Sequence, residues 1–373
     1  MVWGRLVVHV PRVRAESDAP RMSVEDEASG IICAPPFRHS TIQLAHGGGG
    51  RAMRELVDSV FLPAFASGVP APRHDSAVLP AARGRLAFTS DAFVVRPLFF
   101  PGGDIGALAV NGTVNDLAMA GALPEYLSAS FVLEEGLELA TLERVVRSMA
   151  DAARAAGVTI VTGDTKVVDR GHGDGIFIAT SGVGRIEDGV DIAPSKIRPG
   201  DAIVVSGDVG RHGVAVLSVR EGLGFENALD SDCAELGSLV RALFRAGVVP
   251  HCLRDLTRGG LAASLCELAL DGGFDFRIDA RKVPISAAVQ RACEPIGLDP
   301  LYAACAGRCI LFVPDEELGA ALGALAAAGA EPAPIGVVEG VARTRPGRVE
   351  LETALGASRL LELFYGEQLP RVC

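Results

Sequence analysis

The chain has 373 residues, of which 49% are hydrophobic and only 5% aromatic, and its 35 Lys and Arg against 46 Asp and Glu give a formal net charge of −11. This composition is typical of a soluble globular protein, and the length suggests about two domains. The acidic balance and the lack of any basic run of five residues argue against binding to nucleic acid or to an anionic membrane, because both depend on clustered Lys and Arg.

Three further patterns bear on where the protein works. The eight cysteines are irregularly spaced and form no C-x-x-C pair, which favours reduced thiols over a zinc site or a disulfide framework. The most apolar helical stretch, 318–330, is shorter than the roughly 20 residues of a membrane span. Residues 1–38 lack the apolar core of a secretory signal, and we expect them to be a disordered extension. We therefore expect a cytoplasmic protein.

Hydrophobic periodicity predicts the elements of the first half of the chain. Helices are expected over 53–61, 110–117 and 142–153, and strands over 86–95 and 158–161. Thr141 is expected to cap the third helix and Gly157 to end it. Residues 162–166 are expected to form a loop after the second strand.

The second half repeats an alternation of strands and helices. Charge and two prolines mark a boundary near 186–200, and a strand is expected to begin at Asp201. Helices are expected from Leu261 to Leu268 and from Leu318 to Leu325. Beyond Arg343 we expect a short strand over 349–352 and a helix containing Leu360, Leu361 and Phe364. The predicted organisation is an extension (1–38), an N-terminal domain (39–187), a C-terminal α/β domain (188–342) and a tail (343–373).

A glycine-rich segment precedes the first predicted helix. Gly47, Gly48, Gly49 and Gly50 leave bare backbone N–H groups at the positive end of that helix, which is an arrangement that holds phosphate. The segment lacks the Gly-Lys-Ser/Thr of a Walker loop, so a flexible turn is the alternative. His46 is either a nucleotide contact or a structural residue.

Four aspartates recur at positions that a fold would present together. They are Asp75, Asp91 on a strand, Asp116 on a helix and Asp164 after a buried strand. Carboxylates in apolar surroundings are costly without a partner, which favours a bound cation over the alternative of caps and salt bridges. Together with the glycine segment, the four aspartates predict a site for a nucleotide with Mg²⁺.

Three other features carry candidate chemistry. Lys166 is either a phosphate contact or base, or an exposed surface lysine. The segment 254–260, Arg-Asp-Leu-Thr-Arg-Gly-Gly, is typical of an anion-binding turn at a helix start or of plain capping. Cys373, at the chain end after a non-helical segment, is either an incidental thiol or a mobile attachment point.

These residues, in this order, resemble the HypE family of hydrogenase maturation proteins, carbamoyl dehydratases of the aminoimidazole ribonucleotide synthetase and selenophosphate synthetase superfamily. The resemblance covers nearly all of 41–373, and its motifs lie at 41–51, 101–106, 112–119, 161–168, 254–260 and 370–373. The closing Pro-Arg-Val-Cys is the most specific of them.

The resemblance implies a two-domain α/β (α+β) fold, in which the sheet of the N-terminal domain dimerises and the C-terminal domain closes over ATP. It implies that ATP contacts His46, Gly47, Gly48, Gly49, Gly50, Asp91, Asn115, Asp116 and Asp164, and that Mg²⁺ is held by Asp75, Asp91, Asp116 and Asp164. It also implies catalytic roles for Cys373 and Lys166.

The reaction that the resemblance implies takes place on Cys373. A HypF-type carbamoyltransferase loads a carbamoyl group onto the sulfur, ATP phosphorylates the carbamoyl oxygen, and loss of a proton and of phosphate leaves a thiocyanate. Phosphorylation converts the oxygen into a good leaving group. The cyanide then passes to a HypC–HypD-type complex that builds the iron ligands of nickel–iron hydrogenase.

One position departs from the family pattern. Family members usually carry a Glu, thought to help deprotonate the carbamoyl nitrogen, where this chain has Ala306. The alternatives are that Lys166 or Cys305 accepts the proton, or that the chain is slow or inactive. An ATP-binding scaffold with weakened catalysis and a related ATP-dependent small-molecule synthetase are therefore the competing interpretations.

Overall fold

The computed structural model of the chain describes residues 3–4, 39–48, 50–65, 76–77, 79, 84–222, 229–342, 346–353, 355–364 and 371–372. Three predicted site residues, Gly49, Asp75 and Cys373, lie outside these ranges. Most of the predicted extension lies outside them as well.

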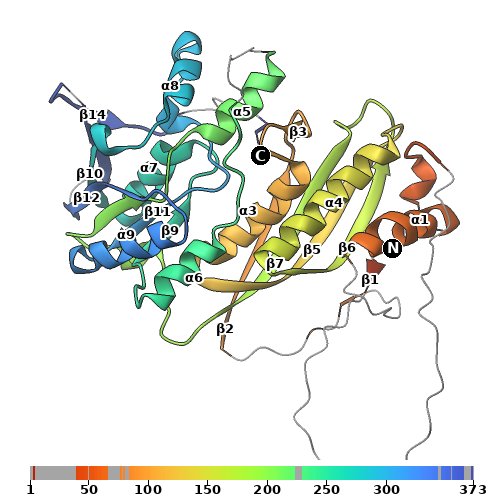
Figure 1. Ribbon diagram of the computed structural model, residues 1–373, viewed down its shortest axis with the longest axis horizontal. Helices are drawn as coiled ribbons and strands as arrows, with labels where there is room; N and C mark the ends of the chain where they lie inside the picture. Colours follow the sequence, from red (N-terminus) through yellow and green to blue (C-terminus); the bar gives the residue numbers. More distant parts are fainter. Residues whose placement is uncertain are drawn as a thin grey trace, which may run out of the picture.

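The N-terminal part is built on a five-stranded sheet with the strand order β1-β6-β5-β7-β2 (Figure 1). Its strands are β1 (Trp3–Gly4), β2 (Arg85–Phe93), β5 (Ala122–Glu134), β6 (Thr159–Val168) and β7 (Ile176–Ile186). β5 and β6 run parallel because a helix, α4 (Leu139–Ala156), connects them, whereas the other neighbouring strands are antiparallel.

Helices cover one face of this sheet. α4 lies beside α3 (Ile105–Met119) on that face, next to the helical run α1 (Gly50–Leu56), η2 (Val57–Phe61) and α2 (Leu62–Phe65) (Figure 1). Burial alternates along β7 and β5, since one side of each strand faces the helices and the other does not. The less buried side is called the open face below. It carries the row Phe88, Val183 and Tyr126 on β2, β7 and β5.

The C-terminal part is built on a seven-stranded sheet with the order β14-β13-β10-β12-β8-β11-β9. Its strands are β8 (Ala202–Val205), β9 (Cys252–Asp255), β10 (Phe274–Asp279), β11 (Cys309–Val313), β12 (Ala333–Val341), β13 (Arg348–Glu352) and β14 (Ser358–Leu361). Its helices are α5 (Arg211–Arg220), α6 (Gly237–Arg245), α7 (Gly260–Gly272), α8 (Ala287–Cys293) and α9 (Leu318–Ala327). β8 and β11 are buried along their whole length, because α7 packs on one face of the sheet and α6 and α9 on the other.

Short elements complete the chain. They are the hairpin β3 (Phe99–Phe100) and β4 (Gly103–Asp104), and the 3₁₀ turns Leu44–His46, Pro194–Lys196, Ala280–Lys282, Glu294–Ile296, Pro300–Tyr302 and Asp315–Glu317. In the described part of the chain no helix has the length and apolarity needed to cross a membrane.

Helix α3 joins the two parts. Its side chains Leu117, Ala118 and Met119 lie in the same buried cluster as α6, α9 and the face of the C-terminal sheet that these two helices cover. The Asp104 carboxylate fixes the start of this helix, accepting hydrogen bonds from the N–H groups of Gly106 at 2.7 Å and Ala107 at 3.1 Å. Residues near the end of α3 are therefore held rigidly at the domain junction.

Three local predictions are wrong. α4 begins at Leu139 after the extended residue Glu138, so Thr141 lies within the first turn and is not the cap. Residues 162–166 are not a loop, because backbone pairing with β5 continues through them to Val168. The residues predicted as a helix around Leu360 form β14, which pairs with β13. Adjacent leucines do not reveal that one of them, Leu361, is buried and the other exposed.

Candidate functional site

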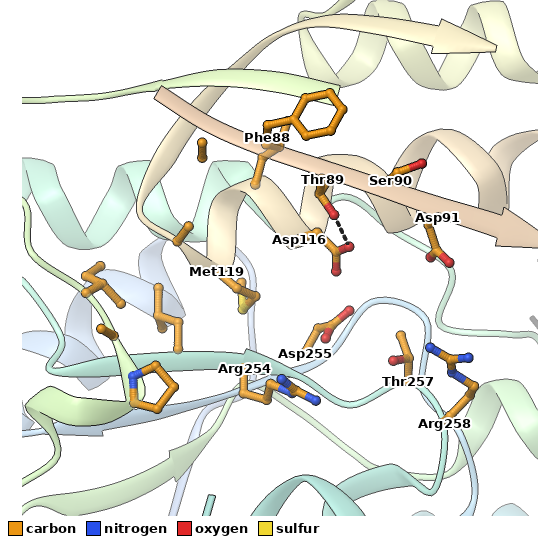
Figure 2. A pocket seen from close by; sticks show the side chains of 17 residues that line it. Phe88, Thr89, Ser90, Asp91, Asp116, Met119, Arg254, Asp255, Thr257 and Arg258 are labelled. Atoms are coloured by element: carbon orange, nitrogen blue, oxygen red, sulfur yellow. Dashed lines mark hydrogen bonds between the residues drawn. The ribbon is translucent and has the colours of Figure 1, made fainter. Parts of the chain in front are cut away.

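A cavity of about 530 Å³ lies where the two parts meet, between β2, the last turns of α3 and the end of β9 (Figure 2). Its polar lining is Thr89, Ser90, Asp91, Asp116, Arg254, Asp255, Thr257 and Arg258. Two predicted site residues, Asp91 and Asp116, are thus brought together. Thr89 and Ser90 come from β2, and the remaining polar residues come from β9 and the turn that follows it.

Two carboxyl groups of the cavity, those of Asp116 and Asp255, have raised pKa values. Asp116 accepts a hydrogen bond from the Thr89 hydroxyl at 2.9 Å, yet removal from water raises its pKa, and the negative charge of Asp91 raises it further. Removal from water, with the charge of Asp116 next in size, raises the pKa of Asp255 to about 7. The cavity lining therefore disfavours the ionised forms of Asp116 and Asp255.

Two arginines supply positive charge on the opposite wall of the cavity. Arg254 and Arg258 flank Asp255, and Figure 2 shows all three lining the same open space as Asp91 and Asp116. Gly259 has a φ of 71° and begins α7 as its N-cap, so the turn presents backbone N–H groups at a helix start. This wall has the chemistry of an anion-binding surface.

The lining fits a nucleotide bound together with a divalent cation. Within the described ranges no three His, Cys, Asp or Glu side chains gather closely enough to form a metal cage on their own. Mg²⁺ seldom needs such a cage, because it retains several waters and binds through one or two carboxylates plus the phosphates of its substrate. Carboxylate oxygens are hard ligands, and a cation next to Asp116 and Asp255 would favour their ionised forms, which removal from water and, to a smaller extent, the neighbouring carboxylates disfavour.

Asp164 lies outside the lining of this cavity. It sits in the middle of β6, three strands from β2, which corresponds to about 14 Å across the sheet. Pairing between strands also puts it on the open face, whereas Asp91 points to the helix-covered face. Asp164 forms an ion pair with Lys166 on the same strand. The cavity of this chain therefore unites Asp91 and Asp116 but not Asp164, whose part in the site stays a prediction.

The glycine segment lies next to the part of β6 that carries Asp164 and Lys166. Gly47 packs so closely on β6 that a Cβ would come within 2.4 Å of the Val167 backbone nitrogen. Gly48 and Gly50 are exposed at the start of α1, where Gly50 has a φ of 73°. Gly47, Gly48 and Gly50 do not line the cavity.

His46 is structural. It is fully buried, and its Nδ1 accepts a hydrogen bond of 3.0 Å from the Gln43 N–H. Burial lowers the pKa of its imidazole. The geometry favours the structural interpretation over the predicted nucleotide contact.

Asn115 is structural as well. Its amide donates to the Ala234 carbonyl at 3.0 Å and accepts from the Leu236 N–H at 2.7 Å. It therefore ties α3 to the segment that leads into α6 and does not line the cavity, so its expected ATP contact stays a prediction.

Ala306 is buried beside a carboxyl group. Its N–H donates to Asp232 at 3.1 Å, and burial raises the pKa of Asp232. The neighbouring thiol of Cys305 is an unsuitable proton acceptor, because burial raises its pKa well above the ordinary value. All six described cysteines are free thiols.

The residues that sequence reasoning missed are Asp255, Arg254 and Arg258 as lining of the same cavity. The motif at 254–260 did stand out, but only as a separate anion-binding turn. A strand of four residues ending in Asp gave no sign that β9 would lie opposite α3.

Comparison with known proteins agrees with this architecture. The family model "AIR synthase related protein, N-terminal domain" matches residues 73–186, and the corresponding C-terminal domain model matches 198–347. A protein of Azotobacter vinelandii named carbamoyl dehydratase HypE is 48% identical over 339 residues, which cover 90% of this chain and 98% of that protein. This chain belongs to the HypE family.

Solved HypE structures have the same fold. A crystal structure described as HypE in complex with ATP superimposes with a TM-score of 0.84 at 46% identity, covering 88% of this chain and 99% of that one. The HypE–HypF complex matches with a TM-score of 0.71 at 42% identity, covering 74% of this chain and 90% of that one. The expected two-domain α/β fold and the expected family are confirmed.

Proposed function

We propose that this chain is an ATP-dependent carbamoyl dehydratase that converts an S-carbamoyl group on Cys373 into a thiocyanate during maturation of nickel–iron hydrogenase. The observation that carries the proposal is the cavity at the domain junction, where carboxylates face two arginines. Membership in the HypE family supports the carbamoyl dehydratase reaction, and the HypE structure in complex with ATP supports ATP as the nucleotide.

The chemistry requires a phosphorylated intermediate. The carbamoyl oxygen attacks the γ-phosphorus of ATP and ADP leaves; the nitrogen then loses its protons and the C–O bond breaks to release phosphate, which leaves S–C≡N. Arg254 and Arg258 would hold the phosphates and offset charge on the transferred group. Asp91, Asp116 and Asp255 would hold Mg²⁺, which when bound neutralises negative charge on the phosphates. Asp75 stays a predicted ligand outside the described residues.

A dimer packed through the open face would unite the two separated groups. A two-fold axis parallel to the strands lays β6 of one copy over β2 of the other, since such a rotation exchanges the edges of the sheet. Asp164, Lys166, Gly47, Gly48 and Gly50 of one copy would then border the cavity of its partner, and Gly49 stays a predicted contact outside the described residues. Phe88, 70% exposed on β2, lies both on the open face and at the cavity rim. Lys166 would act as proton acceptor from that position.

Two partners follow from the reaction. The HypE–HypF complex supports a HypF-type carbamoyltransferase as the donor to Cys373. The cyanide acceptor would be a HypC–HypD-type complex, as expected from the family. We propose a cytoplasmic location, because the reaction consumes ATP.

A second function, an ATP-binding scaffold with weakened catalysis, is favoured by one observation. Ala306 cannot accept a proton, and the high pKa of Cys305 leaves that thiol protonated. The two functions differ in turnover and not in binding.

The count of ADP released per carbamoyl group decides between them. The carbamoylated chain is isolated from its carbamoyltransferase and mixed with Mg-ATP in a single turnover. A dehydratase releases one ADP per carbamoyl group and Cys373→Ala releases none beyond background. A scaffold binds ATP and releases no ADP in either form.

A further inference from the structure

We propose that His212 is a latch that holds the C-terminal end of the chain in a docked position at the domain junction, and that Arg371 fastens the same end to the N-terminal domain. The proposal deepens the proposed function, since it rests on Cys373 as the carrier. His212 is a positioning residue: it acts on the backbone that leads to the thiol.

The latch closes on the last described residue. The His212 imidazole is 1% exposed, and its Nε2 lies 2.6 Å from the Val372 carbonyl oxygen. Its Nδ1 lies 2.8 Å from the Ser231 hydroxyl. The Val372 side chain is itself 2% exposed, packed in the core cluster that includes residues of both domains. A terminal residue is buried to this extent only where contacts tie it down.

The hydrogen-bond network fixes the direction of each bond. A carbonyl only accepts, so the Nε2 of His212 must carry the proton and donate to Val372. The Cys233 N–H donates to the Ser231 oxygen at 3.0 Å, and the Ser231 hydroxyl is then free to donate to Nδ1. Burial lowers the pKa of His212, which is consistent with a neutral ring that accepts at Nδ1.

Arg371 makes the second attachment. Its guanidinium forms an ion pair with Asp174 in the turn before β7, and Asp174 also pairs with Arg96 at 3.2 Å. The Arg371 carbonyl accepts a hydrogen bond of 3.2 Å from the Arg96 N–H. Arg371 has a φ of 60°, which residues other than glycine rarely adopt, so the surrounding contacts must stabilise this conformation.

The two attachments come from different domains. His212 lies on α5 of the C-terminal domain, and its ring centroid is 5.2 Å from that of Phe100 in the N-terminal domain. Asp174 and Arg96 belong to the N-terminal domain. Cys373 follows Val372 directly, about 3.8 Å along the chain, so a fixed Val372 carbonyl fixes where the chain arrives at the thiol. A carrier that visits a separate transferase must release this latch, and dehydration must restore it.

Carboxypeptidase Y tests the latch directly, because the carbonyl that His212 binds belongs to the peptide bond that this protease must cleave to remove Cys373. The full-length wild type, His212→Phe and His212→Gln are digested under native conditions, and loss of the terminal residue is followed by intact mass. Phe keeps the ring volume without donors, whereas the Gln side chain keeps an N–H that can donate to the carbonyl.

We expect cleavage of His212→Phe to be about tenfold faster than that of wild type, the change expected when one net hydrogen bond is lost, and cleavage of His212→Gln to stay within about threefold. Ser231→Ala, which removes only the hydroxyl that orients the ring, is expected to accelerate cleavage severalfold and serves if His212→Phe does not fold. Equal cleavage of wild type and of a folded His212→Phe or Ser231→Ala variant overturns the proposal.

A functional arm separates a latch from a general loss of structure. Loading of Cys373 by the carbamoyltransferase samples the undocked end, so below saturation it should accelerate in His212→Phe, whereas a damaged fold slows it. Slower loading together with unchanged cleavage overturns the latch. If wild type accepts no carbamoyl group at all, the proposed function fails, and the protease comparison still decides whether His212 is a latch.

Discussion

Replacing Asp116 by Asn removes one charge from the cavity while keeping the size of the side chain. The Asn oxygen can still accept the 2.9 Å hydrogen bond from Thr89, so β2 and α3 should stay in register. The substitution also removes the repulsion that helps to raise the pKa of Asp255. The fold should therefore be as stable as that of wild type or slightly more so.

The loss of binding can be bounded from Coulomb's law. Two unit charges about 4 Å apart interact by about 4 kcal/mol at an effective dielectric constant of about 20, the value suited to a partly exposed site such as this one. Part of that attraction is offset, because ionised Asp116 is already destabilised by its removal from water. We expect a loss of about 2–3 kcal/mol, which weakens Mg-ATP binding roughly 30- to 140-fold.

Calorimetric titration with Mg-ATP measures this loss. Asp188→Asn is the matched control, since Asp188 is an exposed carboxylate in the turn after β7 and does not line the cavity. Its affinity for Mg-ATP should equal that of wild type. Equal affinity of Asp116→Asn and Asp188→Asn would remove Asp116 from the nucleotide site and refute the reasoning.

Three further predictions follow from the geometry. If Asp164 serves the partner's cavity, Asp116→Asn and Asp164→Asn should each strongly lower turnover at limiting Mg-ATP, whereas co-expressed mixed dimers, purified on two different tags, should recover one intact site; no recovery would remove Asp164 from the partner's cavity. A Glu at position 306 would lie buried beside Asp232, so Ala306→Glu should lower the free energy of unfolding by about 1–3 kcal/mol, measured by urea denaturation, and unchanged stability would contradict that placement. Burial lowers the pKa of His212 in the folded state despite the opposing charge of Asp232, so the unfolded state takes up a proton at a higher pH than the folded state does. Below about pH 6.5 the free energy of unfolding of wild type should therefore fall by up to about 1.4 kcal/mol per pH unit more than that of His212→Gln. Parallel pH profiles of the two proteins would contradict this.

The extent of prediction from sequence differs between elements and site. Helix α4 was predictable because its apolar residues follow a helical period and Gly157, in a left-handed conformation, ends it. β6, which runs from Thr159 to Val168, was predicted only as far as Val161, since Thr-Gly-Asp-Thr-Lys has the composition of a turn. Pairing with β5, a contact between segments far apart in the chain, keeps these residues extended.

The site shows the same limit. Asp91 and Asp116 were found because a carboxylate within an apolar period stands out, and the cavity unites them. Asp255 was missed as their neighbour, because only the docking of the C-terminal sheet against α3 brings β9 to that place. The role of His212 left no trace in the sequence, since its partner Val372 lies 160 residues away.

The measurement that tests the central claim most directly is the mass of the C-terminal peptide. The chain is loaded by its carbamoyltransferase, separated from it, and analysed by mass spectrometry before and after addition of Mg-ATP. We predict that the Cys373 peptide first gains one carbamoyl group and then, only with ATP, loses the mass of one water. A carbamoyl group that persists unchanged after ATP, or that resides on another cysteine, would contradict the claim that this chain dehydrates a carbamoyl group on Cys373.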